Sequence, residues 1–254
     1  MVTQLTQIVD YCDELLQVQN FSDYCPNGLQ VEGKAEVKKI IAGVTASQSL
    51  LEQALAQQAD LVLVHHGYFW KGEDASIVGL KKKRIACLLK NDVSLLAYHL
   101  PLDAHEDYGN NAELGRLLGV EVKGVVNQGP AAGLLWYGDL NESQTADQLS
   151  LHINTVLGRP PLHLCSTSQQ PIRRLAWCTG GAQNYFEQAA ALGVDAYISG
   201  EVSEQTFHLA RELDVHYFAA GHHATESYGV QALGRHLASQ FGLEYVFIDI
   251  PNPV

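Results

Sequence analysis

The chain has 254 residues and a formal net charge of −12, with 46% hydrophobic and 17% charged residues. This length suffices for one large or two small domains with buried cores, and the composition excludes a largely disordered chain. The acidic balance argues against broad contact with a nucleic-acid backbone, which requires basic surface, and no apolar run approaches the ~20 residues that cross a membrane.

The first predicted element is an amphipathic helix over Leu5–Leu16, with apolar residues at helical spacing and acidic residues between them. This pattern is unlike a signal peptide. The cysteines are odd in number, widely scattered and never arranged as C-x-x-C: Cys12, Cys25, Cys87, Cys165 and Cys178. We therefore predict reduced thiols in a cytoplasmic protein, and neither a disulfide framework nor a thiolate zinc site.

Strands that alternate with helices indicate βαβ units, and one such unit is repeated along the chain. The first copy has predicted strands at Lys39–Val44 and Leu61–Val64, and the second copy starts with a strand at Arg174–Cys178. Glu52-Gln53-Ala54 recurs as Glu187-Gln188-Ala189 and Asp60 recurs as Asp195, both at an offset of 135 residues (187 − 52 and 195 − 60). Between the copies, a strand over Gly133–Leu140 and a helix over Thr145–Leu157 are expected.

A second match follows in the same order. Leu114-Gly115-Arg116 resembles Leu233-Gly234-Arg235 at an offset of 119 residues (233 − 114), which places Asp103 on His222. Two βα units can look alike by chance, but two ordered matches favour internal duplication. We predict an α/β protein of two similar lobes with mixed, largely parallel sheets. The first lobe spans residues 1–125, and the second spans 126–254, with its C-terminal segment returning to complete a site.

Polar residues with metal-binding side chains follow several of the predicted strands. The apolar strand Leu61–Val64 runs into His65 and His66, and the strand Val93–His99 is stopped by Pro101 before Asp103. Open parallel sheets bind ligands beyond the carboxyl ends of their strands, so these residues are candidate ligands. The alternatives are one core and one surface histidine, and an aspartate that caps the next helix.

A third group follows the predicted strand Val215–Ala219. His222 and Glu226 are four residues apart and share one face of a helix. An imidazole and a carboxylate that converge suit zinc, manganese or ferrous iron. Five candidate ligands exceed what one catalytic zinc takes from a protein, so we predict two divalent ions that share Glu226 or Asp103. His105 and His223 are expected in supporting or surface positions.

Five segments together resemble one family: Tyr24–Gly33 (YCPNGLQVEG), Val64–Lys71 (VHHGYFWK), Leu100–Asp103 (LPLD), Ser199–Glu204 (SGEVSE) and Gly221–Glu226 (GHHATE). The chain is similar to the GTP cyclohydrolase I type 2 family, also called NIF-three-like, and closest to its bacterial YbgI-type members. The resemblance implies a metal cleft between two α/β lobes and a ring-shaped homohexamer. It also implies that the family's metal ligands correspond to His65, His66, Asp103, His222 and Glu226.

The expected function is hydrolysis of a nucleotide-like substrate by metal-activated water, since a bound metal lowers the pKa of water. By resemblance, water would attack the guanine imidazole ring of GTP and release formate. Glu201 and His99 are the candidates for proton transfer, and Glu201 has a strand-end salt bridge as its alternative. The turn Thr179-Gly180-Gly181 has two interpretations, a phosphate-binding loop or a simple tight turn.

Two other functions are kept as alternatives. Paired metals also suit displacement at phosphorus, which would make the protein a dimetal phosphoesterase. The other alternative is a non-enzymatic, ring-shaped, metal-binding scaffold whose partner contacts include Asn27, Gln30, Trp70 and Lys71.

Overall fold

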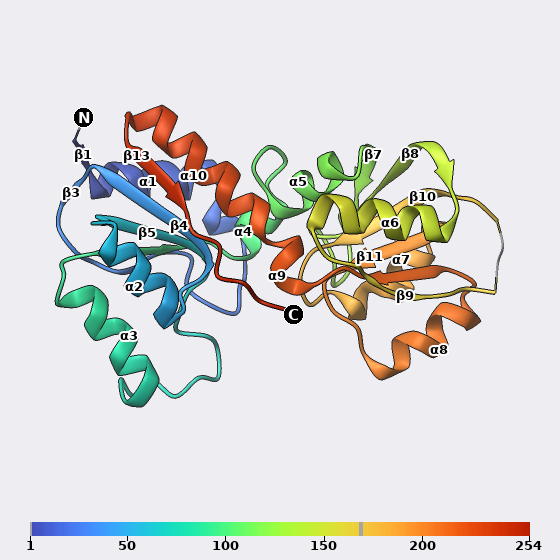
Figure 1. Ribbon diagram of the computed structural model, residues 1–254, viewed down its shortest axis with the longest axis horizontal. Coiled ribbons are helices and arrows are strands. Elements are labelled where there is room, and N and C mark those ends of the chain that lie inside the picture. The colour runs from blue at the N-terminus through green and yellow to red at the C-terminus, as the bar shows by residue number, and fades with distance from the viewer. Residues whose placement is uncertain (1, 168–169) are drawn as a thin grey trace. The chain divides into compact units, whose positions relative to one another are not determined.

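The computed structural model describes residues 2–167 and 170–254 and divides into two compact units (Figure 1). Unit 1 is the chain up to Gly109 together with Gly229–Pro251, and unit 2 is Asn110–Tyr228 together with Asn252–Val254. The division therefore differs from the predicted lobes 1–125 and 126–254. Strand β7 (Val120–Val125) belongs to unit 2 because it pairs with β8, and the C-terminal strand β13 (Glu244–Phe247) returns to unit 1.

Unit 1 is built on a five-stranded sheet in the order β13-β4-β5-β6-β2. All neighbours are parallel except β2 and β6, as predicted for βαβ units. The bounds are β2 Gly28–Val31, β4 Lys39–Thr45, β5 Leu61–His66 and β6 Ser94–Ala97, and a separate antiparallel pair joins β1 (Thr3–Gln4) to β3 (Glu36–Val37).

Helices cover both faces of this sheet. One apolar cluster joins the sheet to α1 (Leu5–Leu15) and α10 (Ser227–Phe241), and a second joins the other face to α2 (Gln48–Ala56) and α3 (Gly79–Leu89). Alternate residues of β4 and β5 enter opposite clusters: Ile40 and Leu61 face α1 and α10, whereas Ile41 and Val62 face α2 and α3. Short helices η1 (Val18–Asn20) and α4 (Leu100–Ala104) complete unit 1.

Unit 2 has a six-stranded sheet in the order β7-β8-β10-β11-β12-β9. Only the pairs β10–β11 and β11–β12 are parallel, so this sheet is mixed, and the prediction of largely parallel sheets holds for unit 1 alone. The reason is that β8 and β9 come from the segment between the two βαβ units. The bounds are β8 Trp136–Gln144, β9 Leu162–Leu164, β10 Ile172–Cys178, β11 Ala196–Ser199 and β12 His216–Ala219.

The core of unit 2 forms where two helices cover one face of this sheet. Leu114 of α5 and Leu149 and Ile153 of α6 join the buried Trp177 of β10. The predicted helix over Thr145–Leu157 is confirmed, because Thr145 caps α6 through the N–H of Gln148 and Gly158 ends it at φ 70°. The bounds are α5 Asn110–Leu117, α6 Ala146–Leu157, η2 Gln183–Tyr185, α7 Phe186–Ala190, α8 Glu204–Glu212 and α9 His222–Thr225.

The two units share one hydrogen-bond arrangement at the predicted offset. In unit 1, Asp60 Oδ2 accepts hydrogen bonds from the N–H groups of Lys38 and Lys39 at 2.7 and 3.0 Å. In unit 2, Asp195 Oδ2 accepts them from the N–H groups of Arg173 and Arg174, both at 2.8 Å. All three pairs of residues differ by 135 (195 − 60, 173 − 38, 174 − 39). Each aspartate precedes the second strand of its βαβ repeat (β5 or β11) and secures the start of the first strand (β4 or β10), as expected for a duplicated repeat.

The second sequence match is shifted by three residues from the strand register. Leu61 pairs with Ser94 in unit 1, and Ala196, its counterpart at offset 135, pairs with His216. Ser94 therefore corresponds to His216 at an offset of 122 (216 − 94), not 119. Asp103 and His222 consequently do not occupy matching positions, because Asp103 lies six residues after β6 and His222 three residues after β12.

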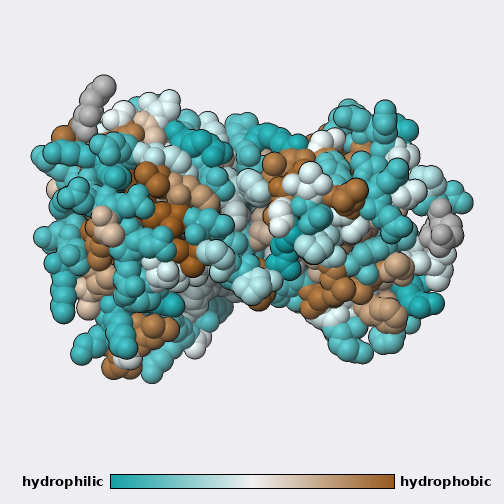
Figure 2. All heavy atoms as spheres, in the orientation of Figure 1, coloured by the Kyte–Doolittle hydropathy of each residue, from teal (hydrophilic) through white to brown (hydrophobic). Residues whose placement is uncertain are grey.

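The start of α3 carries apolar side chains that the fold of unit 1 leaves uncovered. Ile77, Val78 and Leu80 are 51, 62 and 56% exposed, and brown atoms gather over α3 in Figure 2.

Within the described residues, no helix has the length and apolar character needed to cross a membrane.

Candidate metal centre

In unit 1, β5 presents its two final residues, His65 and His66, side by side. Their ring centroids are 4.5 Å apart, although neighbours in a strand ordinarily point to opposite faces. His65 is fully buried, and its Nδ1 lies 2.8 Å from the carbonyl oxygen of Tyr98. Because a carbonyl only accepts, Nδ1 donates this hydrogen bond, and in the neutral imidazole the lone pair is then on Nε2. This arrangement is typical of histidines that bind metal ions.

Asp103 reaches the same cluster from α4. The segment after β6 forms this short helix, with Pro101 in its first turn, so Asp103 is a residue of α4 and not the cap of the following helix. Asp103 is 6% exposed, and its Oδ1 lies 3.5 Å from Nε2 of His65. This separation exceeds a normal hydrogen bond but suits two ligands that bind one ion at ~2.0 to 2.2 Å each.

His99 is the third histidine of unit 1, and its side chain is oriented by Asp23. Nδ1 of His99 lies 2.7 Å from Oδ1 of Asp23, and the His99 N–H donates to Oδ1 of Asn27 at 2.7 Å. His65, His66 and His99 each offer a ring nitrogen within 4.8 Å of the others. His99 therefore faces the paired histidines with one nitrogen held by a carboxylate.

Asp23 has an unusually acidic side chain. Burial raises its pKa, but the hydrogen bond and charge of His99, together with hydrogen bonds from Asn27 and the Tyr24 N–H, lower the pKa from 3.8 to about 2. Only 3% of the side chain is exposed, so solvent screens these contacts little. A depressed folded-state pKa contributes stability above the ordinary pKa of 3.8, and this contribution is lost as the pH falls through about 2.

We therefore expect Asp23→Asn to be less stable than the native chain at neutral pH, by about 2 kcal/mol. The difference in unfolding free energy should shrink as the pH falls from 4 toward 2, because native Asp23 is then protonated as well. Urea unfolding of both proteins across this range measures the difference. A constant difference at every pH would show that the Asp23 carboxylate is not stabilised by its partners.

In unit 2, His222 lies between two carboxylates. Its Nδ1 is 2.7 Å from Oε1 of Glu201, and its Nε2 is 2.9 Å from Oε2 of Glu226. Burial lowers the pKa of His222, but the hydrogen bonds and charges of Glu226 and Glu201 outweigh it and raise the pKa to about 9. His222 and Glu226 converge as predicted from their spacing, with His222 at the start of α9 and Glu226 just after its end. Glu201 orients the imidazole by an ion pair, which was its alternative interpretation.

The turn after β10 is shaped to admit the Glu226 carboxylate. Gly180 has φ +68°, and a Cβ there would collide with Oε1 of Glu226. The N–H of Thr179 donates to Oδ1 of Asn111 at 3.1 Å, and that of Gly180 donates to Oγ1 of Thr225 at 3.1 Å. With two of the three N–H groups bound within the protein, the structure favours the tight turn over the phosphate-binding loop.

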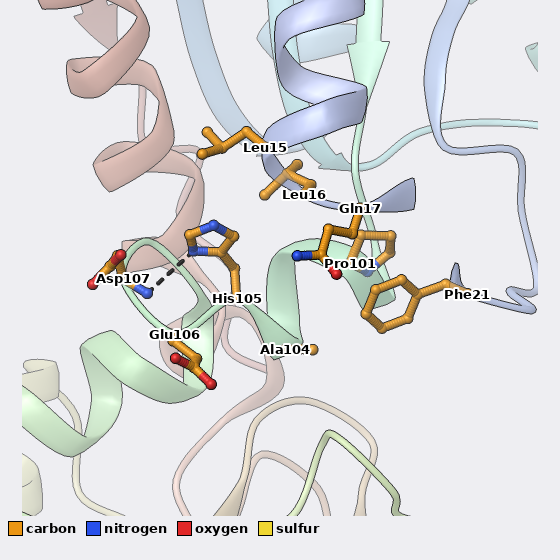
Figure 3. A pocket seen from close by; sticks show the side chains of 9 residues that line it. All are labelled: Leu15, Leu16, Gln17, Phe21, Pro101, Ala104, His105, Glu106 and Asp107. Carbon is orange, nitrogen blue, oxygen red and sulfur yellow. Dashed lines mark hydrogen bonds between the residues drawn. The ribbon is translucent and has the colours of Figure 1, made fainter. Parts of the chain in front are cut away.

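His105 and His223, the two histidines expected in supporting or surface positions, make other contacts. Nδ1 of His105 accepts hydrogen bonds from the N–H groups of Asp107 and Tyr108, both at 3.1 Å. Figure 3 shows His105 in a pocket of about 270 Å³ between α1 and α4, together with Leu16, Phe21 and Glu106. The N–H of His223 donates to the carbonyl of Val254 at 2.9 Å.

Comparison with known proteins identifies the family. The model of the Duf34/NIF3 (NGG1p interacting factor 3) family matches residues 3–253. The chain belongs to the Duf34/NIF3 family. A "GTP cyclohydrolase 1 type 2 homolog" of Pseudomonas aeruginosa is 54% identical over 253 residues and covers 100% of both chains. Its namesake in Escherichia coli K12 is 50% identical over 251 residues, which is 99% of this chain and 98% of the relative.

Solved structures of Duf34/NIF3 relatives have the same fold. A protein described as ybgI, of unknown function, is 49% identical with a TM-score of 0.95, covering 99% of this chain and 100% of that one. The protein TTHA1606 of Thermus thermophilus is 32% identical with a TM-score of 0.89 over 99% of this chain and 100% of its own. The resemblance to this family and the α/β fold with mixed sheets are thus confirmed.

Sequence reasoning did not find the residues that orient the candidate ligands. Asp23, which orients His99, is 76 residues from it in the sequence. Tyr98, whose carbonyl accepts the hydrogen bond from His65, is 33 residues from His65. No local spacing indicates such contacts. The one available signal was the polar composition of the segment Ser22–Asn27, which precedes β2 in the structure.

Proposed function

We propose that the protein is a hydrolase that depends on two divalent metal ions, with His65, His66 and Asp103 as ligands from unit 1 and His222 and Glu226 as ligands from unit 2. The observation that carries the proposal is the pairing of His65 and Asp103. Nε2 of His65, whose proton is on the opposite nitrogen, lies 3.5 Å from a carboxylate oxygen in a buried setting.

The chemistry of the ligands fits such a centre. Three imidazoles and two carboxylates are the ligand set of zinc, ferrous iron and manganese, and all three metals are candidates. Glu226 is 3% exposed and Asp103 is 6% exposed, and buried carboxylates of this kind are costly unless they are paired with positive charge. When bound, two ions would supply the Lewis acidity that activates water and polarises the electrophile.

The surrounding residues orient the ligands and provide a route for protons. The Tyr98 carbonyl fixes the tautomer of His65, and Glu201 holds Nδ1 of His222. His99 is the better of the two candidates for proton transfer, because Asp23 holds its Nδ1 and its Nε2 is left to exchange a proton with the substrate. Glu201, already bound to His222, is assigned a positioning role.

The proposed substrate is nucleotide-like, and the reaction is attack of water on the imidazole ring of guanine with loss of formate. Its support is the family's name in close relatives, each called a GTP cyclohydrolase 1 type 2 homolog. Phosphoester hydrolysis is the competing reaction of the same centre.

A direct assay separates the two reactions. The protein, reconstituted in turn with zinc, iron and manganese, is incubated with GTP, and formate and phosphate are measured in the same samples. We expect formate to form in amounts equal to the GTP lost. Phosphate without formate would replace the cyclohydrolase assignment by a phosphoesterase. Neither product, from protein of full metal content, would contradict hydrolysis of GTP.

A cytoplasmic homohexameric scaffold is the second candidate function, and the exposed apolar side chains at the start of α3 favour it. All five cysteines are free thiols, consistent with a reducing compartment. Light scattering after size exclusion should give six times the chain mass of 27.8 kDa. A monomer would contradict the assembly and leave the hydrolase proposal standing.

A further inference from the structure

The backbone just after the paired histidines is strained. Phe69 has φ +65°, a left-handed conformation that bulky side chains avoid. It lies three residues after His66 and one before Trp70. Strain of this kind costs free energy and persists only where surrounding contacts impose it, and such positions gather at functional sites.

Several contacts impose this conformation. The Gln30 side chain binds both peptide groups of Tyr68: Oε1 accepts from its N–H at 2.7 Å, and Nε2 donates to its carbonyl at 3.2 Å. The Tyr68 hydroxyl donates to the carbonyl of Ala46 at 2.7 Å. The N–H of Lys71 donates to the carbonyl of Tyr24 at 2.6 Å. The turn is thus held at both ends, and the loop containing Tyr24 is attached to it.

The result is that two aromatic rings are held beside His99. Trp70 meets the His99 ring edge-on, with centroids 5.0 Å apart at 84°, and lies 5.9 Å from His66. Tyr24 also approaches His99 edge-on at 6.5 Å, and it is 61% exposed. The three apolar core clusters of the described residues contain neither ring. Trp70 and Tyr24 therefore do not serve the core.

We propose that Trp70 and Tyr24 form a stacking surface for a flat nitrogen heterocycle, such as the purine base of a nucleotide, and place it against His99 and the paired histidines. The inference rests on the proposed function, because it names how the substrate's ring is bound. Aromatic side chains stack on any base through its π face, and a rigid surface loses little entropy on binding. The strained turn at Phe69 provides that rigidity.

Tryptophan fluorescence tests the proposal, because Trp70 is half-buried whereas Trp136 and Trp177 are 4 and 0% exposed. The metal-loaded protein is titrated with guanosine and GTP, and with ribose 5-phosphate as a ligand that lacks a base. We expect saturable quenching by both guanine compounds and none by ribose 5-phosphate. The absence of quenching by guanosine and GTP, or equal quenching by all three, would overturn the proposal.

Equilibrium dialysis with GTP tests the two side chains separately. Trp70→Leu and Tyr24→Leu should each weaken binding roughly tenfold or more, and Trp70→Phe should restore most of it. Phe207→Leu, at an aromatic side chain of α8 that is 45% exposed, is the matched control and should bind like the native protein. Unchanged metal content shows that the variants fold. If Trp70→Leu binds GTP with native affinity, the stacking proposal is overturned, even if formate is released. Binding that depends on the base, without any product, would support the stacking proposal and contradict hydrolysis.

Discussion

We expect Glu226→Gln to retain one metal ion per chain or fewer, against the two proposed for the native protein. The carboxylate is 3% exposed, and its Oε2 lies 2.9 Å from Nε2 of His222, so the other candidate ligand of unit 2 is positioned by it. Glutamine keeps the shape and removes the charge. Loss of a mere supporting contact costs ~10- to 100-fold in metal affinity, and loss of a ligand should exceed that. Plasma mass spectrometry of protein purified without a histidine tag or chelator measures the ratio.

The chain contains a matched control for this substitution. Glu204 and His208 form another pair four residues apart, on the exposed surface of α8, with 3.4 Å between Oε1 and Nε2. Glu204→Gln removes the same charge from the same type of pair, and we expect no change in bound metal. If Glu226→Gln and Glu204→Gln retain equal amounts of metal, Glu226 is not a ligand and the dinuclear assignment fails.

The substitution Gly180→Ala will destabilise unit 2 and disrupt the same cluster. A Cβ at Gly180 would lie well inside 3.0 Å of Oε1 of Glu226, at 2.9 Å from its Cδ and at 3.2 Å from Nε2 of His222. The carboxylate cannot move away without losing its contact with His222. We expect a loss of roughly 2 to 4 kcal/mol in unfolding free energy, the sum of backbone strain and overpacking, together with loss of metal.

Gly193→Ala separates the two contributions. Gly193 has φ +67°, nearly the same as Gly180, but a Cβ there would meet nothing within 4 Å. This variant should therefore show the backbone cost alone, about 1 kcal/mol, with full metal content. Urea unfolding of both variants, with and without a chelator, provides the comparison. Equal losses in the two variants would mean that Glu226 does not occupy the space beside Gly180.

Local patterns were sufficient to predict the class of fold and the identity of the candidate ligands. The strand periodicity around Leu61–Val64 placed His65 and His66 at the end of a strand, and the four-residue spacing placed His222 and Glu226 on one face. The repeat of Asp60 as Asp195 predicted a duplicated βαβ unit, and in the structure both aspartates make the same hydrogen bonds. The first two inferences depend on residues that are close in sequence, where the backbone geometry of a helix or strand determines which side chains lie together.

Contacts between distant segments were decided only by tertiary packing. The sequence predicted which residues are candidate metal ligands, but not that Asp23 orients His99, that Glu201 orients His222, or that Gln30 holds the turn at Phe69. The sequence also did not show that α10 and β13 return to unit 1. Strand pairing depends on which apolar faces must be covered, and the same periodicity is compatible with several arrangements of the strands. Periodicity reports the burial of one element at a time, whereas the orientation of a buried ligand depends on partners that the fold brings from elsewhere in the chain.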